Sequence, residues 1–199
     1  MLRPVILASG SVIRANLLRS AGVEVSVMPA RIDEQMIRQS LQAEAAKPFE
    51  VADALAEMKA ARIADKNPGA LVLGCDQVLE FGGAILSKPE TRSEARLQIA
   101  AMRGKTHKLL SAIVLYDAGK PIWRHLGEAK LTMHAVSDRY LDAYLGRNWP
   151  EISVSVGGYK LEGEGIRLFS AISGDYFTIL GLPLLPLLAY LAQRGFIES

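Results

Sequence analysis

The most informative stretch is Leu71-Val72-Leu73-Gly74-Cys75-Asp76-Gln77-Val78-Leu79-Glu80, in which Asp76 lies among mostly apolar residues. Its aliphatic start follows the turn-forming Asn67-Pro68-Gly69, and this pattern predicts a buried strand at 71–73. A carboxylate without a partner is costly to bury, so Asp76 needs a partner, a metal or a chemical task. The alternative is that Gly74 bends the strand and Asp76 only caps a turn. The local pattern leaves both interpretations open.

The composition is that of a soluble globular protein, with 50% hydrophobic and 22% charged residues among 199. We expect a single domain over residues 1–199. The net charge of +2, with both signs mixed along the chain, does not predict a nucleic-acid partner. One cysteine excludes an intrachain disulfide framework and is typical of a cytoplasmic protein. No apolar stretch is long enough to predict a signal segment or a membrane partner.

Strands and helices alternate along the chain, with hairpins in the middle. Strands are expected at 5–8, 23–27, 71–73, 84–86, 107–116, 122–135, 166–169 and 177–180. Helices are expected at 12–21, 35–46, 48–66, 92–103, 138–145 and 184–194. This order predicts an α/β fold in which a mixed twisted β-sheet is flanked by helices.

The loop Ser9-Gly10-Ser11 joins the first strand to the first helix, for which Ser11 is the expected N-cap. Backbone N–H groups and the helix dipole at such a junction favour an anion, often phosphate. Arg14 adds a positive charge in the first turn. The alternative is that the two serines only turn the chain and Arg14 faces solvent.

Asp33 and Glu34 lie just ahead of the second helix, where the helix dipole alone favours acids. The alternative is a divalent-metal ligand, because Mg²⁺ prefers one or two carboxylates together with substrate phosphates. The local pattern favours the first interpretation. It likewise places Lys59, in the third helix, on a solvated face.

Taken together, the chain resembles the Maf family of nucleoside triphosphate pyrophosphatases from end to end. The motifs that carry the resemblance are Leu7-Ala8-Ser9-Gly10-Ser11 with Arg14 and Leu17-Leu18, Asp33-Glu34, Lys59-Ala60, Gly74-Cys75-Asp76-Gln77, Lys88-Pro89, Gly157-Gly158-Tyr159 with Glu162-Gly163, and Gly181-Leu182-Pro183. The resemblance implies two lobes with a cleft between them, as in the Maf and ITPase-like folds. It also implies hydrolysis of a nucleoside triphosphate to the monophosphate and pyrophosphate, a divalent cation (Mg²⁺ or Mn²⁺) and a capacity to form a homodimer.

The resemblance also implies roles for individual residues. Asp76 would be the catalytic proton acceptor, assisted by Lys59 and Lys88. Glu34 and Asp76 would hold the metal. The residues expected to bind the substrate phosphates are Ser9, Ser11 and Arg14.

Three positions are expected to set nucleotide specificity: Ile13, Gln77 and Glu162. Ile13 replaces an arginine of the family pattern, and with Gln77 and Glu162 it resembles the branch that acts on 7-methyl-GTP. Methylation at N7 gives guanine a positive charge, and a carboxylate such as Glu162 can both offset this charge and accept paired N–H donors.

Two other functions remain open at this level. A catalytically weak, nucleotide-binding regulator of cell division would fit the loss of basic residues at Ile13 and Ser155. The second open function is that of a different phosphohydrolase built on a similar sheet. The G-x-x-x-x-G-K-[ST] motif of P-loop enzymes is absent from the sequence, which disfavours P-loop chemistry.

Overall fold

The computed structural model describes residues 3–198. Its internal contacts divide the chain into two compact units, each assembled from separate segments. The first unit comprises Met1–Gln77, Leu110–Gly127 and Asp175–Ser199, and the second comprises Val78–Leu109 and Glu128–Gly174. The functional residues expected from the sequence are distributed over both.

The sheet of the first unit is built around β1 (Val5–Leu7). This strand pairs in parallel with β2 (Val25–Val27) on one side and with the start of β3 (Leu71–Phe81) on the other. Parts of β5 (Thr106–Asp117) and β6 (Lys120–Met133) follow β3 in the strand order. β1 and the start of β3 are buried throughout, which explains why both are continuous aliphatic runs.

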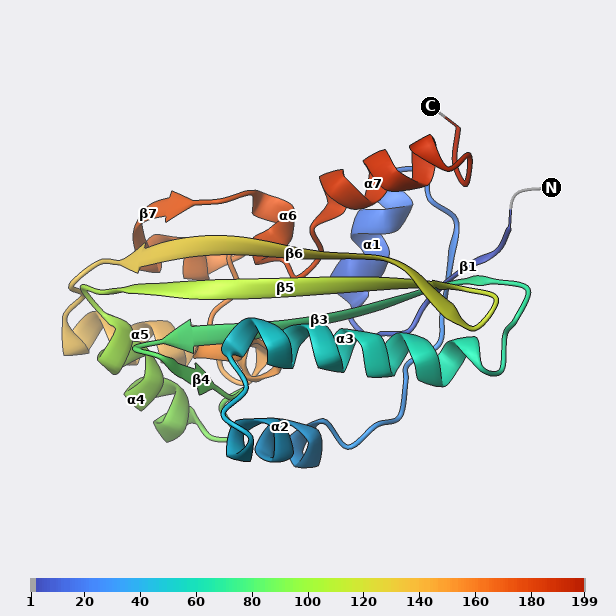
Figure 1. Cartoon of the computed structure of the whole chain (residues 1–199). Coiled ribbons are helices and arrows are strands. Elements are labelled where there is room, and N and C mark those ends of the chain that lie inside the picture. Colours follow the sequence, from blue (N-terminus) through green and yellow to red (C-terminus); the bar gives the residue numbers. More distant parts are fainter. Residues whose placement is uncertain (1–2, 199) are drawn as a thin grey trace. The chain divides into compact units, whose positions relative to one another are not determined.

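Helices cover both faces of this part of the sheet (Figure 1). α1 (Val12–Ser20) and α7 (Leu184–Gln193) lie on one face, and α3 (Pro48–Ala64) lies on the other. The apolar side chains of α1 and α7, including Leu18 and Leu187, share one buried cluster with those of β1, β3 and β5. The short helix α6 (Tyr176–Ile179) precedes α7.

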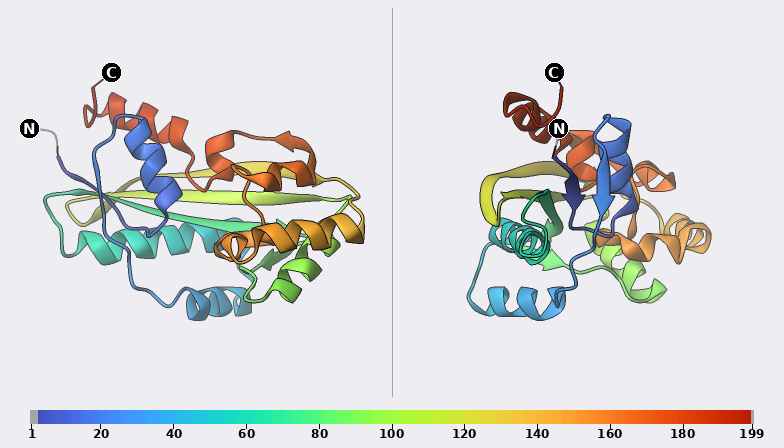
Figure 2. Two further views of the ribbon diagram at one scale, coloured as in Figure 1. Left: turned by 180° about the vertical axis from the view of Figure 1, so that it is seen from behind. Right: turned by 90° about the vertical axis from the view of Figure 1, so that its right-hand side faces the viewer.

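α2 (Glu34–Ala43) lies on the outer side of α3 and contacts it, as the views in Figure 2 also show. Asp33 caps this helix, since its Oδ1 accepts a hydrogen bond from the Met36 N–H at 3.0 Å. No residue of α2 is buried, although the helix is strongly amphipathic. Its partly buried side chains therefore meet the rest of the protein mainly through α3.

α3 packs against β3 at very short range, and Gly74 makes this approach possible. A Cβ at position 74 would lie 2.0 Å from the carbonyl oxygen of Ala56 and 2.8 Å from the backbone nitrogen of Ala60, both on α3. Any side chain here would force the helix off the strand. Gly74 therefore fixes the distance between α3 and β3.

In the second unit, β4 (Ala84–Leu86) pairs antiparallel with the end of β3, and β7 (Phe169–Ser173) pairs antiparallel with β6. α4 (Arg92–Met102) and α5 (Asp138–Asn148) pack against each other. Three short 3₁₀ helices complete the unit, at Glu151–Val154, Val156–Gly158 and Glu164–Leu168.

The structure confirms the predicted α/β class: residues 3–198 form a mixed seven-stranded sheet flanked by helices. The single domain over residues 1–199 and the cleft between lobes stay predictions. No helix among residues 3–198 is long and apolar enough to cross a membrane.

Two predicted strands are wrong. Residues 166–168 belong to a 3₁₀ helix, and strand β7 begins only at Phe169. Residues 177–180 lie in and just after α6, because Asp175 caps that helix by accepting from the Thr178 N–H at 2.9 Å. Both stretches are apolar, which is typical of strands. In the second stretch, the Asp175 cap favours a helix instead. The predicted end of α5 at Gly146 is also wrong, since the helix continues to Asn148.

The interpretation of Asp76 as a turn cap is wrong as well. β3 runs without interruption from Leu71 to Phe81, and Gly74 does not break it. Asp76 lies in the interior of the strand and is only 4% exposed. It is a buried carboxylate within a strand, so it requires partners that offset its lost hydration.

Candidate functional site

The parallel pairing of β1 and β3 brings the predicted phosphate loop beside Asp76. Leu7 is opposite Leu73, and the Ala8 N–H donates to the Leu73 carbonyl at 2.8 Å. Both strands run in the same direction, so the residues that follow Leu7 lie level with Cys75 and Asp76. After β1, the chain forms β2 on one side of β1 and later forms β3 on the other side. In open α/β sheets, ligands bind at such a switch point, outside the carboxyl ends of the strands.

Asp76 belongs to a ring of four charged side chains, formed with Glu34, Arg38 and Lys59. Lys59 Nζ lies 2.7 Å from Asp76 Oδ1 and 2.7 Å from Glu34 Oε1. Arg38 Nη2 lies 3.4 Å from Asp76 Oδ2 and 3.8 Å from Glu34 Oε2. Acids and bases thus alternate, and each base bridges both acids. We call this arrangement the four-charge ring.

The ring explains how two charges can be buried on β3 and α3. The side chains of Lys59 and Asp76 are only 8% and 5% exposed. Each would be costly to bury alone, whereas the pair with its additional partners compensates the lost hydration. The expectation of a solvated Lys59 is therefore wrong. Glu34, at the start of α2, uses its carboxylate for this contact, while Asp33 caps the helix.

Arg14 ties the loop after β1 to β3 and to the turn before α7. Its Nη1 donates to Ser9 Oγ at 3.2 Å and to the Cys75 carbonyl at 3.1 Å. Its Nε donates to the Gly181 carbonyl at 2.7 Å. Arg14 is therefore not on a solvated helix face, and its guanidinium positions the loop next to Asp76.

The two serines hold the loop in shape. Ser9 Oγ accepts from the Ser11 N–H at 3.3 Å, and Ser11 Oγ accepts from the Arg14 N–H at 3.3 Å, which caps α1. The N-cap prediction for Ser11 is confirmed. The first N–H groups of an α-helix have no carbonyl partner within the helix, so those of α1 that the Ser11 cap does not use suit an anion.

Gln77, next to Asp76 on β3, is fixed by its amide nitrogen. Nε2 donates to Ser111 Oγ at 2.9 Å and to the carbonyls of Thr178 and Ile179 at 3.1 and 3.0 Å. Ser111 Oγ in turn donates to the Thr178 carbonyl at 2.8 Å. With the nitrogen held by three acceptors, the amide oxygen is the atom left to meet a ligand donor.

The carboxylates of Glu34 and Asp76 suit a divalent cation by the class of their donors. Both converge on Lys59 Nζ, so they face a common point. Within residues 3–198 no group of three or more His, Cys, Asp or Glu side chains is arranged to hold a metal ion. Two hard oxygen donors fit Mg²⁺ or Mn²⁺ when substrate phosphates complete the coordination, but they do not form a protein cage.

The remaining predicted residues lie apart in the chain. Ile13 is partly buried on α1, directly before Arg14. Lys88 and Glu162 are exposed residues of the second unit, in the segments after β4 and before the last 3₁₀ helix. Their roles stay predictions.

Arg38 is the residue that the sequence analysis missed. It lies one helical turn after Glu34 on α2, and its side chain is only 15% exposed. The spacing of Glu34 and Arg38 is the signal that could have found it, since an acid and a base four residues apart share a helix face.

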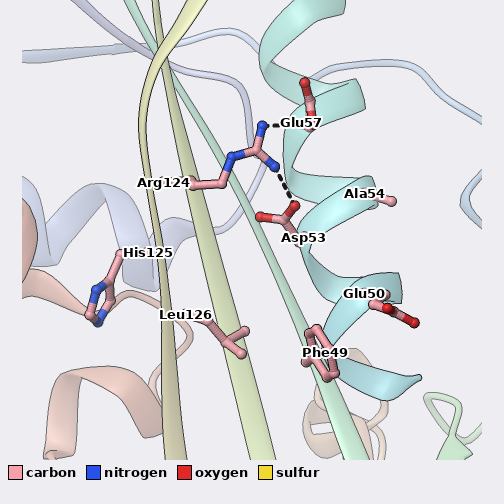
Figure 3. Close-up of a pocket in the computed structure, with 8 residues that line it drawn as sticks. All are labelled: Phe49, Glu50, Asp53, Ala54, Glu57, Arg124, His125 and Leu126. Carbon is pink, nitrogen blue, oxygen red and sulfur yellow. Dashed lines mark hydrogen bonds and ion pairs between the residues drawn. The ribbon is translucent and has the colours of Figure 1, made fainter. Parts of the chain in front are cut away.

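A recess of about 390 Å³ lies between α3 and β6 and contains none of the predicted site residues (Figure 3). Arg124 extends from β6 toward α3 and pairs with Asp53 and Glu57. Phe49 and Leu126 lie beside this ion pair. The charges of Arg124, Asp53 and Glu57 are thus satisfied within the protein.

The sequence matches the Maf family, described as Maf-like protein, over residues 4–194. The chain therefore belongs to the Maf family, as the motifs indicated. It is 58% identical over 195 residues to a nucleoside triphosphate pyrophosphatase from Roseobacter denitrificans, covering 98% of each chain. It is 46% identical over 199 residues to a 7-methyl-GTP pyrophosphatase from Mesorhizobium japonicum, covering both chains completely. A 7-methyl-GTP pyrophosphatase from Brucella suis is 47% identical, with 98% of each chain covered.

Proposed function

We propose that this protein is a nucleoside triphosphate pyrophosphatase, which hydrolyses its substrate to the monophosphate and pyrophosphate. The observation that carries the proposal is the convergence of Glu34, Lys59 and Asp76 beside the loop at the start of α1. A buried carboxylate, a buried ammonium group and a phosphate-type loop are the groups that this reaction requires. Full-length relatives bear the same activity in their names.

The chain's own residues divide the reaction between them. The N–H groups at the start of α1 hold phosphate oxygens, and the loop that presents them is held in place by Arg14. Asp76 accepts a proton from a water molecule as the water oxygen attacks the α-phosphorus. The bond between the α-phosphorus and the bridging oxygen breaks, and pyrophosphate leaves with the electron pair. Lys59 and Lys88 offset the charge that develops on it.

Glu34 and Asp76 would hold a divalent cation, Mg²⁺ or Mn²⁺, at the ring. When bound, the cation supplies charge neutralisation for the phosphates and lowers the pKa of a bound water. Lys59 keeps both carboxylates oriented toward the common point. The homodimer expected from the resemblance stays a prediction.

For the base of the nucleotide, we propose 7-methyl-GTP or a similarly modified purine nucleotide. Gln77 presents its amide oxygen because its nitrogen is held by Ser111 and α6. An acceptor at this position suits the N–H donors of guanine. Glu162 would add a carboxylate for the remaining donors and for the positive charge of the methylated ring. Some relatives are named for this substrate, whereas others carry only the general name.

The decisive experiment measures pyrophosphate and orthophosphate release with 7-methyl-GTP, GTP, UTP, dTTP and CTP, with Mg²⁺ or Mn²⁺. The expected result is pyrophosphate release that is fastest with 7-methyl-GTP. An Asp76→Asn variant should fold and lose nearly all turnover, and retained activity would remove Asp76 from its role as base. A Glu162→Gln variant should lose the preference for the methylated nucleotide; an unchanged order of substrates would refute the role of Glu162.

A catalytically weak regulator of cell division is not favoured. The acids and the lysine expected for catalysis are present and in mutual contact. Relatives of essentially the same length are named as pyrophosphatases. The absence of nucleotide hydrolysis in the panel above would reverse this preference.

A further inference from the structure

We propose that Arg38 is a substrate-binding residue that covers Asp76 in the free protein and transfers to the triphosphate when nucleotide binds. The inference rests on the proposed function and adds a cation that none of the family motifs contains. It is carried by the asymmetry of the four-charge ring, by the access to Asp76 and by the surroundings of α2.

The two bases of the ring hold the acids unequally. Lys59 contacts both carboxylates at 2.7 Å, which is the optimum for a charged hydrogen bond. Arg38 contacts the same carboxylates at 3.4 and 3.8 Å, beyond that optimum. Asp76 would therefore keep Lys59 and release Arg38 when a stronger anion arrives.

Both oxygens of Asp76 are covered by a base. Lys59 lies against Oδ1, Arg38 lies against Oδ2, and the side chain is only 5% exposed. Uncovering one of these oxygens would give the water of the proposed reaction easier access to Asp76. Departure of Arg38 uncovers Oδ2 and leaves the carboxylate paired with Lys59.

The guanidinium of Arg38 is incompletely satisfied in its present position. Its Nε is buried and has no hydrogen-bond partner among residues 3–198. Arginine carries five N–H donors in a planar fork, which matches two oxygens of a phosphate. A phosphate oxygen pair would satisfy donors that the carboxylates of the ring do not reach.

The position of Arg38 on α2 makes its transfer inexpensive. α2 buries none of its residues completely. Elements with few fully buried apolar contacts move at low cost in free energy. Arg38 can thus change partners without disturbing the packed core around β1 and β3.

Substrate charge supplies the driving force. The ring is neutral, with two acids and two bases, whereas a triphosphate is strongly anionic. Once a triphosphate reaches the loop beside Asp76, Arg38 gains more from the phosphate oxygens than from a carboxylate already shared with Lys59. The transfer would couple nucleotide binding to the exposure of the catalytic oxygen.

The test is calorimetric titration with a 7-methyl-GTP analogue whose α,β-bridging oxygen is replaced by a methylene group, so that no turnover occurs. Arg38→Gln should weaken its binding by about tenfold or more, the usual effect of losing a charged hydrogen bond. Arg38→Lys, which keeps the charge but not the fork, should fall between. The matched control is Arg62→Gln, because Arg62 is an exposed arginine of α3 outside the ring. Equal affinities of wild type and Arg38→Gln would overturn the proposal.

A second comparison separates a transferring residue from a fixed brace for Asp76. In an Asp76→Asn background, Arg38 no longer has to leave a carboxylate, so Arg38→Gln should weaken binding by a larger factor than in the wild type. If Arg38 only held Asp76 in place, Arg38→Gln would not change the affinity for the analogue in the Asp76→Asn background. Thermal denaturation of each variant confirms that it is folded.

These outcomes are distinct from failure of the proposed function. If the wild type releases pyrophosphate but Arg38→Gln binds the analogue normally, only the assignment of Arg38 fails. If the wild type neither binds the analogue nor releases pyrophosphate, both fail.

Discussion

Replacing Gly74 with alanine tests whether the close approach of α3 to β3 sets both stability and the site. The new Cβ would lie 2.0 Å from the Ala56 carbonyl oxygen, whereas real Cβ atoms essentially never approach within 3.0 Å. The helix or the strand must therefore move by at least 1.0 Å. Two of the three obstructing atoms belong to the backbone, so no side-chain rotation relieves the clash.

The expected cost is about 3 kcal/mol, the upper part of the usual range for overpacking a core. For a chain of this length, that corresponds to a fall in Tm of about 6–12 °C. Without the clash, alanine in a strand would instead be slightly stabilising relative to glycine. The sign of the change therefore tests the structural argument directly.

The same substitution should also lower kcat. Lys59 precedes Ala60, whose backbone the new Cβ would meet, so a shift of α3 displaces Lys59 from Asp76. A misplacement of about 1 Å at a catalytic contact can reduce the rate by about 100-fold. Pyrophosphate release is measured at a temperature at which the variant is fully folded.

Gly69→Ala is the matched control, because a Cβ there meets nothing within 4 Å and the residue is exposed. It should leave both Tm and kcat close to the wild-type values. If Gly74→Ala behaved like Gly69→Ala, the account of how α3 positions Lys59 would be refuted.

Three further predictions concern polar groups that are buried or partly buried. Lys59→Met should lower the free energy of unfolding by about 3 kcal/mol, the lower end of the cost of breaking a buried ion pair. Adding Asp76→Asn should restore the free energy of unfolding, measured by urea denaturation, but should not restore pyrophosphate release. Gln77→Glu should cost about 1–3 kcal/mol, because a carboxylate would face the acceptors that now bind the amide nitrogen; an unchanged Tm would argue against that network. Burial lowers the pKa of His107 from 6.5 to about 4, so the unfolded chain binds a proton in that range that the native protein does not. The free energy of unfolding should therefore fall by about 3 kcal/mol as the pH drops from 6.5 to 4. His107→Gln should remove that part of the slope, as urea denaturation at several pH values would reveal.

The sequence allowed much of the fold to be predicted because many boundaries are local. Ser11, Thr91 and Ser137 each cap the helix that follows them, and such a residue just ahead of a helix is a signal within the local sequence. The paired glycines at Gly82 and Gly83 both take positive φ in the hairpin between β3 and β4. Caps and turn glycines act over a few residues, so they can be recognised without knowledge of the tertiary packing.

Prediction failed where a local signal competed with apolar composition. The stretch at 177–180 contains strand-forming residues, but the cap from Asp175 makes most of it helical. The aliphatic run predicts a strand only over 71–73, because Gly74 and Asp76 are ordinarily poor strand residues. Both are accommodated by α3, whose backbone approaches Gly74 and whose Lys59 neutralises Asp76.

Motifs in a fixed order are enough to indicate the family, the alternation of strands and helices, and the candidate residues Glu34, Lys59 and Asp76, because they can be recognised without distances. The contacts among these residues follow only from the folded chain. Folding buries Lys59, joins it to two acids from different elements and adds Arg38 to the same ring. The physical reason is that the energy of a charge depends on its solvation and on the charges within a few ångströms, which folding brings together from α2, α3 and β3.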